Sequence, residues 1–141
     1  MTPIKLPSPT AQWSGCMWLP RIVAKARLLK DGALPADYVA RFCHPSGVDG
    51  QFIGFFGLNR DEIIAASEQT DDGVAKWFTS LPGVTGARIE AWNTLAVNLG
   101  RPGFPMAERM PIAMATTYEH LRDRVFATVF EVLRADEADA G

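Results

Sequence analysis

The sequence feature that most constrains the fold is an apolar stripe that begins at Trp18 and continues along one helix. Pro20 suits the first position of a helix, where its missing N–H has no partner, and Gly32 suits the left-handed position beyond the end. We therefore expect a helix from about Pro20 to Lys30. At 100° per residue, four apolar side chains fall within an arc of about 80°, which is wide enough for a buried face: Trp18, Ile22, Ala26 and Leu29.

Two cations lie at the border of this stripe, one helical turn apart. Lys25 falls within about 20° of the apolar arc and Arg21 about 40° further out, whereas Arg27 points to the opposite face. Like charges at this spacing repel each other, so an anionic group should lie beside them. It is either a carboxylate of the chain in a partly buried ion pair, such as Asp49 or Glu90, which we favour, or a bound anionic ligand.

The rest of the chain predicts an all-α fold of five to six helices packed around one core. Asn59 with Glu62 and Thr116 with Glu119 resemble capping boxes, and Thr85 and one of Asp71 and Asp72 are further N-cap candidates. The remaining expected helices cover residues 60–69, 71–80, 86–99 and 116–134, and residues 101–115 form a loop with one helical turn. Residues 48–57 are apolar but contain three glycines, so they are a helix, which we favour, or a minor strand or irregular segment.

Three segments describe the domain organisation. Prolines make residues 1–12 an extended arm, residues 13–135 form a single helical domain, and residues 136–141 are an acidic tail that frays. No apolar run approaches the ~20 residues that span a bilayer, and no secretory signal is evident, so we expect no membrane partner. Two cysteines and no export signal favour the cytoplasm.

The charge is unevenly distributed along the chain. The net charge of −2 argues against a general nucleic-acid binder. Residues 1–41 carry six Lys/Arg and two Asp/Glu, whereas residues 42–141 carry eight and fourteen. We expect these two parts to neutralise one another through ion pairs rather than to form a dedicated anion surface.

Cys43 and His44 invite two chemical interpretations, a nucleophilic thiolate and a metal site. A thiolate needs a base in space, and a histidine next in sequence usually points elsewhere, which leaves only His120. Two cysteines and two scattered histidines lack the spacing of a zinc site, so we expect no metal and no cofactor. Cys43 is then a small buried hydrophobe and His44 a hydrogen-bonding loop residue.

Asn93 lies on the inward face of the helix expected over residues 86–99. A buried amide needs partners, which are either backbone groups of a neighbouring loop, such as the Gly47–Gly50 turn, or a ligand. Asp49-Gly50 is first a turn element and second an acid. Glycine-rich phosphate loops, dinucleotide fingerprints and hydrolase or metalloprotease motifs are not found in the sequence.

One string of residues resembles a known family. Trp18-Leu19-Pro20-Arg21 followed by Lys25-Ala26-Arg27, then Leu34-Pro35, Tyr38, Phe42-Cys43 and Glu90-Ala91-Trp92-Asn93, is similar to a domain of unknown function numbered fifty-sixty-nine. The resemblance covers roughly residues 13–99, and the last helix more loosely. It implies a bacterial, cytoplasmic, stand-alone helical domain with no assigned activity. The C-terminal third departs from the family pattern, since the segment here ends Arg134-Ala135-Asp136-Glu137.

Three functional hypotheses follow. The first is a non-catalytic binding or regulatory domain for a small anionic ligand or a protein partner, and the second is an enzyme acting on a small polar substrate through Asp49, His44 or Cys43. The third is a structural homodimer, because the last helix is apolar around much of its circumference. The ligand-binding candidates are Arg21, Lys25, Tyr38, His44, Asp49 and Asn93.

Overall fold

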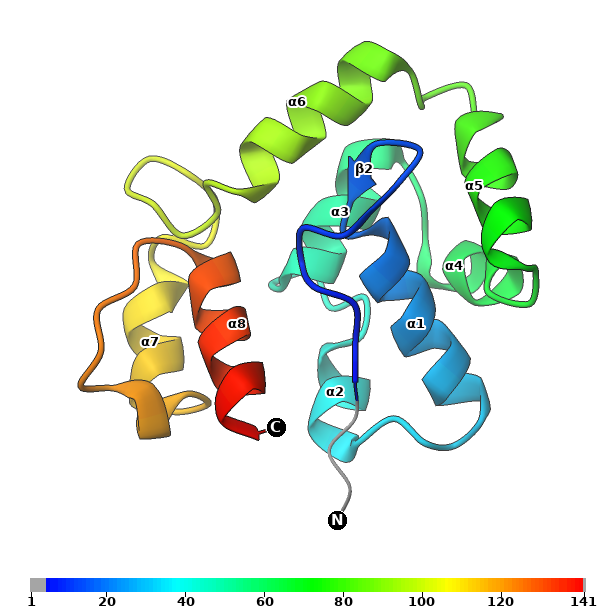
Figure 1. Cartoon of the computed structure of the whole chain (residues 1–141). Helices are drawn as coiled ribbons and strands as arrows, with labels where there is room; N and C mark the ends of the chain where they lie inside the picture. Colours follow the sequence, from blue (N-terminus) through cyan, green and yellow to red (C-terminus); the bar gives the residue numbers. More distant parts are fainter. Residues whose placement is uncertain (1–4, 141) are drawn as a thin grey trace. The chain divides into compact units, whose positions relative to one another are not determined.

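The computed structural model describes residues 5–140, and the side chains of residues 5–138 (Figure 1). The described chain is mainly helical and comprises two compact units, residues 5–93 (the N-terminal unit) and residues 94–140 (the C-terminal unit). It contains eight α-helices rather than the expected five to six. The two additional helices are short ones, α2 (Ala36–Arg41) and α7 (Arg109–Ala115), which the sequence pattern did not separate from the neighbouring turns. The division into arm, domain and tail stays a prediction.

Helix α1 (Leu19–Lys30) confirms the expected first helix within one residue at its start. Pro20 occupies its first turn, and Gly32 adopts a φ of +70° beyond its end. Trp18 is the N-cap residue and has a left-handed backbone, with a φ of 75°. Trp18, Ile22 and Ala26 are buried and Leu29 is partly buried, so the predicted stripe is the core face of α1.

A short antiparallel hairpin precedes α1 and was not expected. Strand β1 (Gln12–Trp13) pairs with β2 (Cys16–Met17) in the register Gln12 to Met17 and Trp13 to Cys16. Ser14 and Gly15 form the two-residue turn, and both have a positive φ, of 52° and 81°. Such turns match the right-handed twist of the paired strands. The hairpin begins at Gln12, the last residue of the segment that we expected to be an extended arm.

Helix α3 (Val48–Phe56) confirms the helical interpretation of the glycine-containing segment. It follows α2 (Ala36–Arg41) and the turn at residues 42–47. Gly50 is required where this turn crosses the helix, because a Cβ there would overlap the carbonyl oxygen of His44 and lie 2.7 Å from the Cα of Pro45. The minor strand considered for residues 48–57 is therefore wrong, and the described strands lie earlier in the chain.

Helices α4 (Arg60–Ala66), α5 (Asp71–Thr79) and α6 (Gly86–Ala96) each begin at a side-chain cap. Asn59 accepts a hydrogen bond from the Glu62 N–H at 2.9 Å, and Thr85 from the Arg88 N–H at 3.1 Å, as expected. The cap of α5 is Thr70, which accepts from the Gly73 N–H at 3.1 Å, rather than Asp71 or Asp72. Both candidate aspartates lie inside the first turn, where their charge still complements the helix dipole.

Aromatic rings form the core of the N-terminal unit. Phe52 of α3 stacks on Phe78 of α5 with 6.0 Å between ring centroids and meets Trp92 of α6 edge-on at 5.4 Å. Phe56 meets Phe78 edge-on at 5.0 Å. These arrangements are the preferred geometries for aromatic pairs and contribute beyond the area that they bury.

The C-terminal unit corrects the expected last helix. Thr116 and Glu119 do not open it: α7 (Arg109–Ala115) is followed by a 3-10 turn, Glu119–Leu121, and α8 spans Val129–Ala140. The capping box of α8 is formed by Thr128 and Glu131. The Thr128 N–H donates to the Glu131 carboxylate at 3.2 Å, and the Glu131 N–H donates to Thr128 Oγ1 at 3.3 Å.

The core of the C-terminal unit is small. Ala96, Leu99 and Phe130 are buried, and one buried cluster consists of Leu121, Val132 and Ala135. Four partly buried side chains pack against this cluster: Met110, Met114, Tyr118 and Phe126. Helix α8 includes the acidic residues after Asp136 and ends at Ala140. None of the helices in the described part of the chain is long and apolar enough to span a membrane.

Candidate functional site

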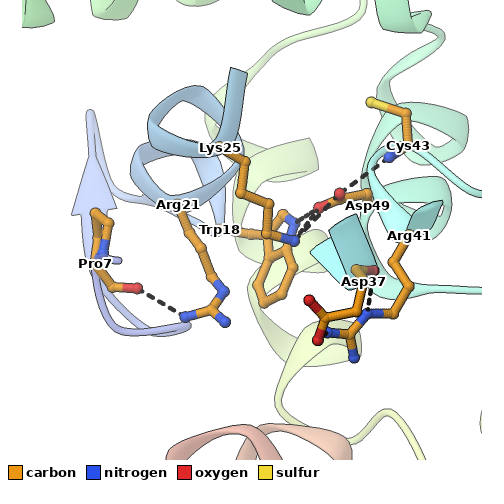
Figure 2. Close-up of polar contacts among 8 residues, drawn as sticks. All are labelled: Pro7, Trp18, Arg21, Lys25, Asp37, Arg41, Cys43 and Asp49. Carbon is orange, nitrogen blue, oxygen red and sulfur yellow. Dashed lines mark hydrogen bonds and ion pairs between the residues drawn. The ribbon is translucent and has the colours of Figure 1, made fainter. Parts of the chain in front are cut away.

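The candidate site is built around the carboxylate of Asp49, which is buried in the N-terminal unit (Figure 2). Its Oδ1 accepts hydrogen bonds from Trp18 Nε1 at 2.8 Å and from Lys25 Nζ at 3.1 Å. Its Oδ2 accepts from Lys25 Nζ at 3.2 Å and from the Cys43 N–H at 3.0 Å. We call these four residues the Asp49 centre. Each carboxylate oxygen has two donors, so the buried charge is compensated.

Local structure explains how the members of the Asp49 centre meet. Trp18 and Lys25 come from the N-cap and the core face of α1, and Asp49 lies in the first turn of α3, where the helix dipole favours an acid. Cys43 has a left-handed backbone, with a φ of 58°, at the turn between α2 and α3. The expectation that a carboxylate of the chain pairs with Lys25 is confirmed, and Asp49 rather than Glu90 supplies it.

Several cations affect the pKa values of this centre. Burial lowers the pKa of Lys25 below its ordinary value of 10.5, Asp49 opposes that change, and the guanidiniums of Arg21 and Arg41 lower the pKa further. The positive charge of Arg60 acts on the Cys43 thiol and lowers its pKa. Asp49 is thus the one carboxylate among the causes of the shift at Lys25, and Arg41 is itself paired with Asp37.

Arg21 and Arg41 come from different elements, and Figure 2 shows Arg21 with Pro7 and Arg41 with Asp37. Arg21, on α1, is buried, lies 5.2 Å from the centroid of the Trp18 ring and donates to the Pro7 carbonyl at 3.0 Å. The Arg41 side chain, at the end of α2, is 37% exposed and pairs with Asp37 at 3.6 Å. Its guanidinium lies 4.8 Å from the centroid of the Tyr38 ring. Arg21, which we placed at the edge of the apolar stripe, is thus inside the core.

Two of the candidate residues, His44 and Asn93, form hydrogen bonds with residues outside the Asp49 centre. His44 is exposed, and its Nδ1 contacts the Ser46 N–H at 3.1 Å and the Ser46 Oγ at 2.7 Å, as expected for a loop residue. Asn93 accepts from the Met17 N–H at 3.0 Å and donates to the Gly15 carbonyl at 2.7 Å. The amide therefore has the backbone partners that we expected, but they belong to the β1–β2 hairpin and not to the Gly47–Gly50 turn.

Both cysteines are free, buried thiols. Burial raises the pKa of Cys16 to about 12. Burial, with a smaller contribution from the Asp49 charge, raises the pKa of Cys43 to about 12. Because the nucleophile is the thiolate, neither sulfur is activated at neutral pH. Within residues 5–140 no group of three or more His, Cys, Asp and Glu side chains is arranged to hold a metal ion.

The basic beginning of the chain forms ion pairs with later acidic residues, as its charge distribution predicted. Arg27 pairs with Asp71 at 2.7 Å and donates to the carbonyls of Ser67 and Gln69, at 3.1 and 2.8 Å. Lys30 pairs with Glu68, and this contact lowers the pKa of the Glu68 carboxyl. Arg27 therefore serves the packing of α1 on α4 and α5, on the face opposite to the Asp49 centre.

Two members of the Asp49 centre were missed from sequence. The Trp18 indole and the Cys43 backbone N–H both donate to the carboxylate, and Arg41 contributes its charge. A buried indole N–H needs an acceptor, which was a signal for Trp18. The sequence held no comparable signal for the backbone of Cys43, because its left-handed conformation depends on the turn that crosses Gly50.

Fold and site together define the class of protein: a mainly helical protein with a compensated ionic cluster in its N-terminal core. The family model for a domain of unknown function (DUF5069) matches residues 4–139, and the chain belongs to this family. Searches of the curated proteins and of the solved structures gave no significant match.

Proposed function

We propose that this protein is a non-catalytic binding domain for a small anionic ligand, which it holds beside the Asp49 centre with Arg21, Lys25, Arg41 and Tyr38. The observation that carries the proposal is a cluster of cations: the guanidiniums of Arg21 and Arg41 both act on the buried amine of Lys25. Fixed cations of this kind attract an anion without any rearrangement of the centre.

Of the three cations Arg21, Lys25 and Arg41, Arg41 is the one that solvent reaches. Its guanidinium is partly exposed and lies against the Tyr38 ring, which restricts its movement. A planar guanidinium held in this way can bind a carboxylate or a phosphate through two parallel hydrogen bonds. The remaining candidates, His44 and Asn93, are engaged with Ser46 and with the hairpin, and the proposed site does not include them.

Thermal unfolding in the presence of anions tests the proposal. Sulfate, phosphate, citrate and malate are compared with chloride at equal ionic strength, and a specific ligand at 100 times its Kd should stabilise the fold by about 2.7 kcal/mol. Arg41→Gln should remove that stabilisation. Arg101→Gln is the matched control, because Arg101 is exposed in the C-terminal unit, where its Nε donates to Asn98 at 3.0 Å. Equal responses of all anions, or equal effects of the two variants, would contradict the proposal.

The enzymatic alternative has less support. It relied on Asp49, His44 and Cys43, but Asp49 accepts four hydrogen bonds, His44 contacts Ser46 and the Cys43 thiol has a raised pKa. A nucleophile and its base need to lie within hydrogen-bonding reach, and these contacts direct the three groups elsewhere. We therefore propose binding rather than turnover through these residues.

A homodimer is a second candidate, favoured by exposed apolar side chains in the C-terminal unit. Val125 is 98% exposed, and Phe104 and Ile112 are also exposed. We expected the last helix to form the interface, but two of its apolar residues, Phe130 and Val132, are buried, and we now propose a contact through the exposed residues outside α8. Light scattering tests this candidate, because a species of 15.4 kDa at high concentration would rule out the dimer.

The free thiols support a proposed location in a reducing compartment. Neither Cys16 nor Cys43 forms a disulfide, as is usual for proteins of the cytoplasm. We propose a bacterial cytoplasmic protein, and fractionation of cells that express it with its native ends tests the location.

A further inference from the structure

Ser46, in the turn before α3, is hydrogen-bonded to a histidine ring. Its Oγ lies 2.7 Å from His44 Nδ1, and solvent reaches both residues, since His44 is exposed and Ser46 is partly exposed. The hydroxyl of Ser80, by contrast, donates to the Trp77 carbonyl at 2.6 Å. A carbonyl oxygen is too weak a base to take the proton of a hydroxyl, whereas an imidazole nitrogen can take it. Ser46 therefore has a base beside its hydroxyl that Ser80 lacks.

The hydrogen bonds of the turn assign the proton of the His44 ring. The main-chain N–H of Ser46 also lies against His44 Nδ1, at 3.1 Å, and an N–H group can only donate. Nδ1 is therefore the acceptor, with its lone pair directed at Ser46, and the ring proton is on Nε2. The Ser46 hydroxyl then donates to Nδ1 as well. A serine O–H that donates to an unprotonated imidazole nitrogen is the arrangement that activates a serine as a nucleophile.

The main chain holds the ring and the hydroxyl in this arrangement. The His44 N–H donates to the Arg41 carbonyl at 3.0 Å, and the His44 carbonyl accepts from the Gly47 N–H at 3.1 Å. The same carbonyl lies so close to Gly50 that a Cβ there would have no room. His44 and Ser46 are thus positioned by the end of α2 and the first turn of α3. A nucleophile and a base that are already in place lose little entropy when they react.

We infer that Ser46 is an acylation site, at which an activated ester transfers its acyl group to the hydroxyl with His44 as the base. The inference goes beyond the proposed anion site and does not depend on it, because it uses different side chains. The class of acyl donor follows from the exposure of the pair. Without a pocket around it, the hydroxyl reacts with a donor whose carbonyl is already electrophilic and whose leaving group departs without assistance, and esters of acidic phenols meet both requirements.

The acyl transfer balances without a further reagent. The Ser46 oxygen forms a bond to the carbonyl carbon of the ester while the hydroxyl proton moves to His44 Nδ1. The bond between the carbonyl carbon and the phenol oxygen then breaks, and the phenol takes the proton that Nδ1 received. One serine and one ester thus give one acyl-serine and one phenol, and the His44 ring returns to its starting form.

Acetylation by p-nitrophenyl acetate tests the inference. The folded protein is treated with this ester at pH 8, and acetylated serines are located by peptide mass spectrometry. We expect Ser46 to be acetylated at least about tenfold faster than Ser80, which is exposed but has no base beside it, because a positioned base contributes that much or more. At pH 5 the acetylation of Ser46 should slow, since a protonated ring cannot take the hydroxyl proton. Equal rates for the two serines would overturn the inference.

Matched variants separate the serine from the histidine. His44→Gln keeps a hydrogen-bonding side chain in the turn but has no basic nitrogen, so the acetylation of Ser46 should fall to the rate of Ser80. His120→Gln, at the other histidine of the chain, should leave that rate unchanged. In Ser46→Ala the release of nitrophenolate should drop. If the release persists undiminished, the His44 ring itself takes the acetyl group and the inference is wrong. The comparison of Ser46 with Ser80 in the wild type decides the question even if a variant does not fold.

Discussion

The two units of this protein are stabilised in different ways. The N-terminal unit has interlocking rings of Phe52, Phe56, Phe78 and Trp92, and the same core contains the Asp49 centre. The C-terminal unit has fewer buried hydrophobic residues, among them the cluster of Leu121, Val132 and Ala135, and leaves Ile112 and Val125 exposed. A large core can accommodate a compensated ion pair, whereas a small one depends more on helix caps such as that of Thr128.

The comparison can be measured because all four tryptophans, at positions 13, 18, 77 and 92, lie in the N-terminal unit. Tryptophan fluorescence therefore reports unfolding of that unit, while far-UV circular dichroism follows the helices of both. The predictions below use this difference.

The largest effect is expected in the aromatic core. Phe52→Ala should lower the free energy of unfolding by about 4 kcal/mol, because it removes a ring that contacts three others and leaves a cavity. Leu121→Ala in the small core should cost about 2 kcal/mol, at the lower end for such changes, because fewer buried neighbours lose contacts. Urea titrations followed by fluorescence for the first variant and by circular dichroism for the second measure both. Equal losses would show that the cores do not differ as described.

Removing the charge of Asp49 should have the next largest effect. Asp49→Asn leaves the Lys25 ammonium buried without a carboxylate and should lower the free energy of unfolding by about 3 kcal/mol. The control is Asp71→Asn, which breaks an ion pair with Arg27 on a side chain that is 65% exposed and should cost less than about 1 kcal/mol. Urea unfolding followed by tryptophan fluorescence compares them. Similar values for the two variants would mean that the Asp49 centre contributes no more than a surface pair.

The buried thiols should make the N-terminal unit sensitive to alkali. An ordinary thiol ionises near pH 9.0, whereas burial raises the pKa of Cys16 and Cys43 to about 12. Between these values the unfolded chain loses protons that the folded chain keeps, so stability falls as pH rises, by about 1.4 kcal/mol per pH unit for each thiol.

The double variant Cys16→Ala/Cys43→Ala isolates this contribution. Urea unfolding at pH 9 and pH 10, followed by fluorescence, should show a smaller loss for the variant than for the wild type. Lys25, whose pKa is lowered, has the opposite slope, because the folded chain releases its proton first, but this contribution is common to both proteins. Parallel pH profiles would show that the thiols are not the cause.

The smallest effect concerns the cap of α8 in the C-terminal unit. Thr128→Ala should lower the free energy of unfolding by about 1 kcal/mol, because it removes the acceptor for the Glu131 N–H. Thr116→Ala is the control, since Thr116 is exposed and donates only to the Ile112 carbonyl, and its cost should stay within about 0.5 kcal/mol. Circular dichroism at increasing urea concentrations measures both. A larger loss for Thr116→Ala would restore the capping box first expected there.

Thr116 and Thr128 also show why part of the fold could not be predicted. Both threonines precede a glutamate by three residues, so the local capping pattern is the same. The structure uses only the second, because Leu121 packs into the small core with Val132 and a continuous helix from Thr116 would not allow that contact. In the same way, the hairpin at residues 12–17 has only two residues in each strand and is anchored by Trp92 and Asn93, far along the chain.

The sequence by itself determined the helix that begins after Trp18, the caps at Asn59 and Thr85, and the need of Lys25 for an anionic neighbour. These features depend on groups within about four residues of each other, or on the face of a single helix. Only the tertiary structure decided that Asp49 is that neighbour, that Trp18 and the Cys43 backbone share it, and that Arg21 is buried. Which carboxylate pairs with Lys25 depends on how α1 and α3 pack. Before that packing is known, Asp49 and Glu90 are equally plausible partners for the lysine.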